Sequence, residues 1–147
     1  MRLLFTSLFF VIAAKSFCIS WTKEFNGVSS SEKINLSDGR KVSHYKNNGN
    51  WKDSLGNYGT QRCFGTILTN SEKKIEDWKL FCEGMDQNRN NFVLEYHRNT
   101  NMDAGTGSYI FIDGTGKWKD LIGTKCKYAI TYLDNAMFNF DKCNSNN

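Results

Sequence analysis

Hydrophobic and polar residues alternate along most of the chain with a period of two, and no segment has the period of about 3.6 residues typical of a long amphipathic helix. Alternation of this kind is typical of strands that bury one face. The pattern predicts eight strands, which cover residues 30–36, 40–46, 60–69, 78–85, 92–98, 108–113, 124–132 and 136–142. We therefore expect an all-β protein.

Turn-forming residues separate these strands. The chain contains 12 glycines and no proline, and glycine and asparagine are frequent between the predicted strands. The strongest turn signal is Asp38-Gly39, because a two-residue type I′ hairpin turn needs residues that tolerate a positive φ. Asp134-Asn135 separates the last two strands in the same way. These turns predict successive antiparallel hairpins.

One peptide occurs twice in nearly the same form, as GNWKDSLG at 49–56 and as GKWKDLIG at 116–123. Each copy follows two predicted strands and precedes a pair of strands that carry one cysteine each. The chain therefore divides into two similar halves of four strands, related by duplication or by convergence on the same local need. In both cases we expect the glycine to permit a bend and the tryptophan, Trp51 or Trp118, to fill the core beneath it.

The first cysteine-bearing hairpin has a register that its residue numbers can test, because opposed residues of an antiparallel pair have a constant sum. Placing Cys63 opposite Cys82 also sets Arg62 opposite Glu83 on the other face. One face of the hairpin is then apolar and the other ends in an ion pair, an arrangement that stabilises strand pairing. The register therefore predicts a Cys63–Cys82 disulfide.

The second hairpin supports a Cys126–Cys143 disulfide less well. This pairing centres the turn on residues 134–135 and puts both cysteines at a non-hydrogen-bonded site, where side chains approach closely. The same register, however, puts Phe138 and Phe140 on the face opposite to the tyrosines of the preceding strand. A bulge at 141–142 or another connectivity would remove this conflict, and four cysteines allow three pairings. We favour 63–82 together with 126–143.

Eight strands in one small chain would leave two unpaired edges that invite aggregation. Closure into a barrel removes those edges, and the interior of an eight-stranded barrel is filled by side chains or holds one small ligand. We therefore expect a closed or nearly closed antiparallel barrel of about eight strands, held by disulfides. A β-sandwich is the alternative fold.

The N-terminal segment reads as a separate unit. Arg2 supplies a positive start, residues 3–14 are apolar, and small residues follow at which cleavage after Ser16 or Ser20 is expected. The apolar run is too short to span a bilayer, and the bulky, charged segment before Cys18 argues against a lipidated cysteine. We therefore expect a secretory signal over 1–20 and a single domain over 21–147. Four cysteines then remain for two disulfides, as suits a secreted or periplasmic protein.

A connection near the C-terminus resembles that of a known group of barrels. Gly114-Thr115-Gly116-Lys117-Trp118, followed by Gly123, is similar to the Gly-Thr-Gly-x-aromatic…Gly connection of allene-oxide-cyclase-like barrels, which belong to the calycin-like group. With its Cys126-Lys127-Tyr128-Ala129 strand, the chain also resembles uncharacterised secreted bacterial proteins of that type. The resemblance covers the C-terminal third and implies an eight-stranded barrel. It carries over no cyclase reaction, because no catalytic residue of that family matches a position in this chain.

The chain lacks the motifs of nucleotide, metal and catalytic sites. The Gly-Thr-Gly segments at 105–107 and 114–116 lie between strands and lack the Gly-Lys-Ser/Thr of a phosphate loop. Residues 86–91 start like a calcium loop but have Asn91 at the sixth position and His97 at the twelfth, so we expect a hairpin turn. Removal of Arg2 and Lys15 takes two charges from the formal +4, and a charge this small argues against a nucleic-acid partner. We expect no metal and no cofactor.

Five residues are the candidate ligand contacts. Arg98 shares a face with the apolar positions of its strand, Tyr96 among them. This position fits a barrel mouth where the guanidinium faces the anionic group of a ligand, and it also fits a side chain at a strand end that extends into solvent. The other candidates are aromatic residues that line a pocket or, equally well, fill it: Trp51, Tyr96, Tyr109 and Trp118.

These residues favour a non-enzymatic module that binds a small, partly apolar or anionic ligand. The alternatives are a module that binds a protein, such as an inhibitor of an extracellular hydrolase, and a cyclase or isomerase on the same barrel. We expect no nucleic-acid partner and, once the signal is removed, no membrane partner. A ligand-binding barrel needs a pocket of roughly 300 Å3 or more, so the cavity volume discriminates between these functions.

Overall fold

The computed structural model describes residues 19–98 and 105–145, which form eight strands and one short 3-10 helix. The strands are β1 (Ile19–Asn35), β2 (Lys41–Asp53), β3 (Tyr58–Thr69), β4 (Ile75–Asp86), β5 (Asn91–Arg98), β6 (Thr106–Gly114), β7 (Lys125–Leu133) and β8 (Ala136–Ser145), and the helix η1 (Gly116–Leu121) connects β6 with β7. The expected signal lies outside the described residues except for Ile19 and Ser20, which pair with β8.

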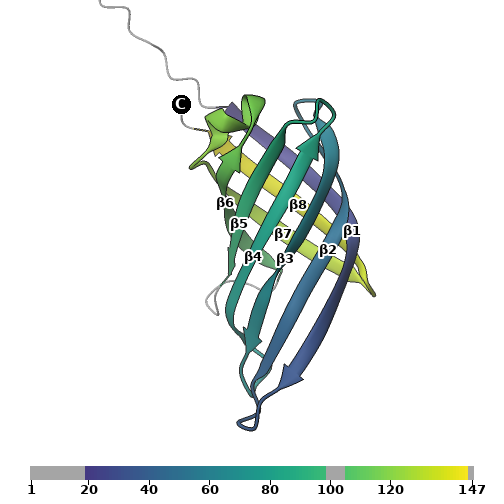
Figure 1. Ribbon diagram of the computed structural model, residues 1–147, viewed down its shortest axis with the longest axis vertical. Coiled ribbons are helices and arrows are strands. Elements are labelled where there is room, and N and C mark those ends of the chain that lie inside the picture. The colour runs from purple at the N-terminus through teal and green to yellow at the C-terminus, as the bar shows by residue number, and fades with distance from the viewer. Residues whose placement is uncertain (1–18, 99–104, 146–147) are drawn as a thin grey trace, which may run out of the picture.

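The strands close into one antiparallel barrel (Figure 1). Each strand pairs with its neighbours in sequence, and β8 pairs with β1 over residues 136–145 and 19–28. Each strand in the described part of the chain is therefore hydrogen-bonded on both sides, which removes the edges that invite aggregation. The closed all-β barrel is confirmed, and the sandwich is excluded.

Strands β1 and β2 are longer than the alternation predicts. Residues 19–29 belong to β1, in which Trp21, Lys23 and Phe25 occupy inward positions and are buried. A lysine at an inward position hides this strand from a search for alternating apolar residues. In the same way, residues 49–53 continue β2, although the sequence places them in a connection.

The two copies of the repeated peptide differ in conformation. Residues 49–53 extend β2, whereas Gly116–Leu121 form η1, which lies at one end of the barrel (Figure 1). Both tryptophans are buried, and the rings of Trp51 and Trp118 meet at 82° with their centroids 5.6 Å apart. The repeat therefore supplies two parts of one aromatic plug, and the expectation that its tryptophans fill the core is confirmed.

Both cysteine-bearing hairpins have the predicted registers. Cys63 lies opposite Cys82 and Cys126 lies opposite Cys143. Both pairs form disulfides, with Cα atoms 4.0 and 4.4 Å apart. The connectivity 63–82 with 126–143 is therefore confirmed.

The outward side chains of these hairpins explain the conflict in the second register. Arg62 and Glu83 form the expected ion pair on the outer wall, at 2.6 Å. β7 and β8 pair without any register shift, so neither a bulge nor another connectivity is needed. Phe138 and Phe140 instead lie on the outer surface, where they are 48% and 49% exposed.

The first hairpin turn differs in length from the prediction. The backbone N–H of Leu36 donates to the carbonyl of Arg40 at 2.9 Å, so three residues form the loop. Gly39 has a φ of 85°, whereas Asp38 is not among the residues with a positive φ, which a type I′ turn would require. The hairpin is where the sequence predicts it, but its register is shifted by one residue.

Strands β1 to β4 extend past the rest of the barrel at the end opposite η1 (Figure 1). β1 leaves β8 after Val28 but pairs with β2 as far as Asn35. Within the described residues, β4 pairs with β5 from Trp78 onward but with β3 from Ile75. The inner face of this projecting sheet continues the inner face of the barrel. We call residues 30–35, 41–44, 66–69 and 75–77, with the turns that join them, the overhang.

Candidate functional site at the overhang

The inner face of the overhang forms a hollow of about 360 Å3. Its lining residues come from all four strands and from the β3–β4 turn, and they are Ser31, Lys33, Lys41, Ser43, Ile67, Thr69, Lys73 and Ile75. The registers explain why they share a face, since Lys33 lies opposite Ser43 and Lys41 lies opposite Thr69. The hollow falls in the range of about 300–1,000 Å3 that small-molecule sites occupy.

Three lysines face this hollow: Lys33, Lys41 and Lys73. The ion pairs within residues 19–98 and 105–145 involve other cations, and none of the described residues that line the hollow is a carboxylate. Charges of one sign around a concave surface raise the local concentration of counter-ions. The hollow therefore has the electrostatics of an anion-binding site.

Arg98 stacks on Trp78 on the inner face of β4 and β5. The two residues are directly opposed on β5 and β4, and the central guanidinium carbon is 5.4 Å from the centre of the indole ring. Trp78 is opposite Ile67, which lines the hollow. The cation–π contact holds the guanidinium against the ring. It places a fourth cation and an aromatic surface on the same inner face as the three lysines.

Two tyrosines bridge the barrel beside this contact. The hydroxyl of Tyr45 on β2 lies 3.1 Å from the hydroxyl of Tyr132 on β7, and Tyr45 is opposite Ser31 of the hollow. Tyr45 also packs edge-on against Trp78, with ring centroids 6.4 Å apart. We call Tyr45, Trp78, Arg98 and Tyr132 the mouth. These four residues lie between the hollow and the barrel interior.

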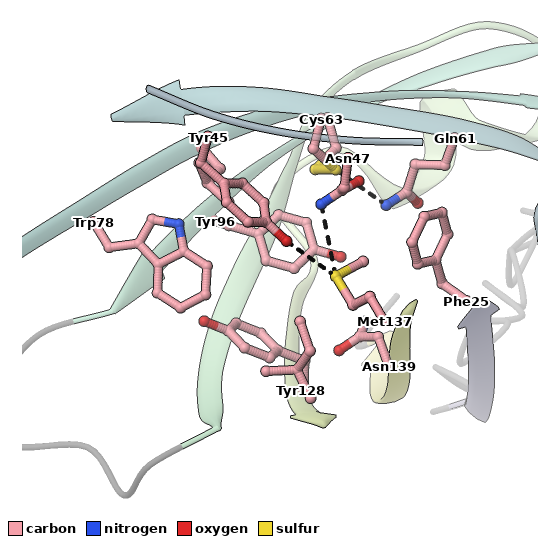
Figure 2. A pocket seen from close by; sticks show the side chains of 13 residues that line it. Phe25, Tyr45, Asn47, Gln61, Cys63, Trp78, Tyr96, Tyr128, Met137 and Asn139 are labelled. Carbon is pink, nitrogen blue, oxygen red and sulfur yellow. Dashed lines mark hydrogen bonds between the residues drawn. A yellow bond between two sulfur atoms is a disulfide. The ribbon is translucent and has the colours of Figure 1, made fainter. Parts of the chain in front are cut away.

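Beneath the mouth, the barrel contains an internal cavity of about 20 Å3, whose lining is shown in Figure 2. Tyr45 and Asn47 both donate hydrogen bonds to the sulfur of Met137, at 3.2 and 3.8 Å, and so connect β2 with β8 across the interior. A volume of this size accommodates about one water molecule. It is far below the roughly 300 Å3 that an organic ligand needs. Space for a ligand therefore exists at the overhang and not inside the barrel.

Two buried donors adjoin the mouth. The indole Nε1 of Trp78 and the hydroxyl of Tyr128 make no hydrogen bond with the described residues, and the two rings lie 6.3 Å apart. Burial raises the pKa of Tyr128, and the nearby Arg98 lowers it by less, so the phenol keeps its proton at neutral pH. A buried donor without an acceptor is costly. A ligand oxygen that reaches the mouth would relieve that cost.

Deeper in the barrel, Lys23 and Asp141 form a buried ion pair. Lys23 Nζ lies 3.2 Å from Asp141 Oδ2 and donates to Gln61 Oε1 at 2.9 Å. Asp141 also accepts hydrogen bonds from the Tyr109 hydroxyl at 3.1 Å and from Asn139 Nδ2 at 2.6 Å. Burial lowers the pKa of Lys23 and raises that of Asp141, and their attraction opposes both shifts. Because the pair is enclosed, we assign it to the framework of the barrel.

At the end closed by η1, Asp86 organises the turn that resembles the start of a calcium loop. Its Oδ1 accepts hydrogen bonds from the backbone of Asn88 and Asn90, at 2.8 and 2.9 Å, and its Oδ2 accepts one from the Trp118 indole at 3.0 Å. Burial alone would raise the pKa of Asp86, but these hydrogen bonds together lower it by a larger amount. The pKa of Asp86 therefore lies below its ordinary value. Within residues 19–98 and 105–145, no group of three His, Cys, Asp or Glu side chains is placed to hold a metal ion.

The structure does not bring the five predicted ligand contacts into one pocket. Arg98 lies at the mouth, whereas Tyr96 and Tyr109 pack against each other in the interior with ring centroids 4.6 Å apart. Trp51 and Trp118 form the plug at the other end. The four aromatic residues are all more than nine-tenths buried. None of the five lines the hollow, although Arg98 lies in one row of opposed residues with Ile67 and Ser43 of its lining. Ligand binding by any of the five stays a prediction.

Sequence reasoning missed the lysines of the hollow. A two-residue turn at Asp38-Gly39 would put Lys33 and Lys41 on opposite faces of the hairpin, because a shift of one residue turns every side chain over. The observed three-residue loop puts both on the inner face. A prediction with the correct turn length would have placed Lys33 and Lys41 on the same face. The projection of β1 to β4 beyond the barrel, however, depends on relative strand lengths, which no local sequence signal specifies.

No family model matches the chain, and neither a curated protein nor a solved structure matches it. Within the described residues, no helix has the length and apolar character needed to cross a membrane. The two disulfides fit an oxidising compartment. The small eight-stranded barrel fits a calycin-like fold in general and points to no particular family.

Proposed function

We propose that the protein is a non-enzymatic binding protein for a small anionic ligand with an apolar part, and that the ligand binds in the hollow of the overhang. The observation that carries this proposal is the convergence of Lys33, Lys41 and Lys73 on one concave surface whose described lining contains no carboxylate. A secreted or periplasmic location is part of the same proposal, in keeping with the disulfides.

The lining divides the hollow into two chemical parts. The three lysines supply charge for an anionic group, such as a carboxylate, sulfonate or phosphate. Ile67 and Ile75, with the Trp78 ring beneath them, supply the apolar contact. A ligand of this kind would satisfy both parts at once, and neither part needs a change in the packed interior.

As part of the same proposal, we suggest that the barrel is related in fold to the allene-oxide-cyclase-like barrels. This likeness depends on the connection from Gly114 to Gly123, whose residues form η1 and hold Trp118 in the plug. That connection lies at the end of the barrel opposite the hollow. The likeness therefore adds nothing to the choice of ligand.

Two fluorescent probes with related aromatic frameworks test the proposal. Anilinonaphthalene sulfonate carries an anionic group, and N-phenylnaphthylamine is its neutral counterpart. We expect the oxidised, folded protein to bind the sulfonate more tightly than the neutral amine. We also expect this preference to shrink as salt is added, because salt screens exposed charges. Equal affinity for the two probes would contradict the proposal.

Paired variants then locate the site. Lys33→Ser/Lys41→Ser removes two cations from the hollow, whereas Lys46→Ser/Lys119→Ser removes two exposed lysines that do not line it. We expect the first variant to lose about three- to tenfold in affinity for the sulfonate, from two exposed charges, and the control to change little. If both variants bind the sulfonate equally well, the hollow is not the binding site.

A further inference from the structure

The outer wall of the barrel carries an apolar cluster on β1, β7 and β8. Its members are Val28, Ala129, Leu133, Phe138 and Phe140, which we call the β8 face. Four of them are large and exposed, with fractions of 49% for Val28, 68% for Leu133, 48% for Phe138 and 49% for Phe140. Exposed apolar side chains gathered in one place mark an interaction surface more often than isolated ones do.

The registers bring these residues together. Phe140 lies opposite Ala129, and Phe138 lies opposite Thr131. Both rings therefore have a smaller side chain as their neighbour on β7. On the other side, Phe138 faces Asn26 of β1. The Cys126–Cys143 disulfide holds this register, which keeps the aromatic rings on the outside. Their exposure therefore follows from the covalent framework.

Three lysines continue the face along the same strands. Lys127 lies directly opposite Lys142, and Lys125 is two residues away on β7. Together with Phe140, they line one depression on the outer surface. Within the described residues, no carboxylate forms an ion pair with any of the three. Directly opposed like charges disfavour strand pairing, so an anionic partner would relieve a local repulsion.

Two acidic residues lie beside this face, Glu24 on β1 and the exposed Asp134, which follows Leu133 in the β7–β8 turn. Glu24 is opposite Phe140 on β1, and its carboxylate pairs with Lys52 at 3.0 Å. A symmetric contact between two copies would therefore oppose two apolar faces that each carry three lysines against the single carboxylate of Asp134. The excess of cations on both copies favours an anionic surface over a second copy as the occupant.

We propose that the β8 face binds the surface of a membrane rich in anionic lipids. Phe138 and Phe140 enter the boundary between headgroups and acyl chains, and the lysines contact the negative headgroups. Protruding aromatic and aliphatic side chains beside cations are the features that hold proteins at such a surface. A protein partner would instead need a pocket for each ring. The proposal departs from the expectation of no membrane partner, which considered only segments able to span a bilayer.

Sedimentation with lipid vesicles tests this inference. The oxidised protein is mixed with vesicles of phosphatidylcholine alone or with vesicles in which phosphatidylglycerol replaces a third of that lipid. We expect binding to the anionic vesicles, weak binding to the neutral ones, and a loss of binding at high salt. The absence of binding to anionic vesicles at low salt would overturn the proposal.

Variants of exposed residues assign the binding to this face. Lys127→Ser/Lys142→Ser should weaken binding to anionic vesicles by about fivefold per lysine, and Phe138→Ser/Phe140→Ser should weaken it by about tenfold or more. Phe64→Ser/Met85→Ser, which removes two exposed apolar side chains on β3 and β4, is the control for the phenylalanine variant. Lys46→Ser/Lys119→Ser, which removes two exposed lysines elsewhere, is the control for the lysine variant. Thermal unfolding establishes that each variant is folded. Equal binding by the face variants and the controls would refute the assignment.

A competing occupant is an acidic polypeptide. Polyglutamate serves as the probe, and its binding is measured with the same variants. If the face variants lose affinity for polyglutamate while the wild type ignores anionic vesicles, the surface binds an acidic protein and the membrane proposal is wrong. The hollow of the overhang is not altered by these substitutions, so probe binding there reports separately on the ligand proposal.

Discussion

Lys23 and Asp141 form an ion pair inside the barrel, with Nζ 3.2 Å from Oδ2 and side chains that are 1% and 0% exposed. Hydrogen bonds extend from this pair toward both disulfides. Gln61, which accepts from Lys23, donates to Cys63 Sγ at 3.5 Å, and the Tyr109 hydroxyl, which donates to Asp141, lies 3.4 Å from Cys143 Sγ. The ion pair thus lies at the centre of a network that connects opposite walls.

The ion pair should be more costly to break than to replace. Asp141→Asn leaves Lys23 buried without a counter-charge, and we expect it to lose about 3–5 kcal/mol of unfolding free energy. The double variant Lys23→Met/Asp141→Leu removes both charges at similar volume, and we expect it to be at least 2 kcal/mol more stable than Asp141→Asn, roughly the recovery seen when a charge pair is replaced by apolar groups. Denaturant unfolding of the three proteins measures this. A double variant less stable than the single one would show that the pair stabilises the fold outright.

The two disulfides should contribute comparably to stability. They join cysteines separated by 19 and 17 residues, and closure of loops of that size stabilises by about 3 kcal/mol each. We expect Cys63→Ala/Cys82→Ala and Cys126→Ala/Cys143→Ala to lower the unfolding free energy by similar amounts. Peptide mapping without reduction checks the pairing directly, and recovery of any peptide that joins Cys63 to Cys126 or Cys143 would contradict it.

Asp86 should make stability depend on pH in the acidic range. Its folded pKa lies below the ordinary value of 3.8, so the unfolded chain takes up the proton first as the pH falls. The stabilisation is therefore fully present above about pH 4 and is lost as the pH falls through the folded pKa. We expect Asp86→Asn to be less stable than the wild type at pH 7, by about 1–3 kcal/mol.

The same variant provides the control for this sign. As the pH falls below 3.8, the unfolded wild-type chain takes up the Asp86 proton before the folded protein does, so the stability difference between the two proteins should shrink. Thermal unfolding across pH 2–7 measures the difference. A gap that stays constant over this range would mean that the charge on Asp86 contributes nothing and that only the shape of the side chain matters.

The registers of the cysteine hairpins could be predicted from the sequence because two opposed cysteines leave a strand pair no freedom to slip. The apparent conflict at Phe138 and Phe140 arose only from the assumption that large apolar residues point inward. Apolar atoms make up more than half of a typical protein surface, so an outward phenylalanine violates no rule. The strand register deduced from the cysteines was therefore correct, and the assumption that every large apolar side chain is buried was wrong.

Features that depend on distant parts of the chain could not be predicted. The inward position of Lys23 makes sense only beside Asp141, which lies near the other end of the sequence. The candidate site depends on the one-residue difference in the turn at Gly39, and on how far β1 to β4 project beyond the other strands. The position of Arg98 on the inner face, in contrast, could be predicted from the sequence, because side chains alternate strictly between the two faces along β5.

Substitutions at the mouth and in the barrel interior should have different effects on probe binding. Arg98→Gln removes the guanidinium that stacks on Trp78, which is opposite Ile67 of the hollow, and we expect it to weaken binding of anilinonaphthalene sulfonate by about two- to fivefold, the effect of one charge near the surface. Binding of the neutral N-phenylnaphthylamine should not change, because that probe has no charge to lose. Tyr109→Phe deletes a hydroxyl that donates to Asp141 deep in the barrel, so it should lower the unfolding free energy and leave both affinities intact. The opposite pattern, in which Tyr109→Phe weakens probe binding and Arg98→Gln does not, would place the ligand inside the barrel, where the 20 Å3 cavity would have to expand to admit it.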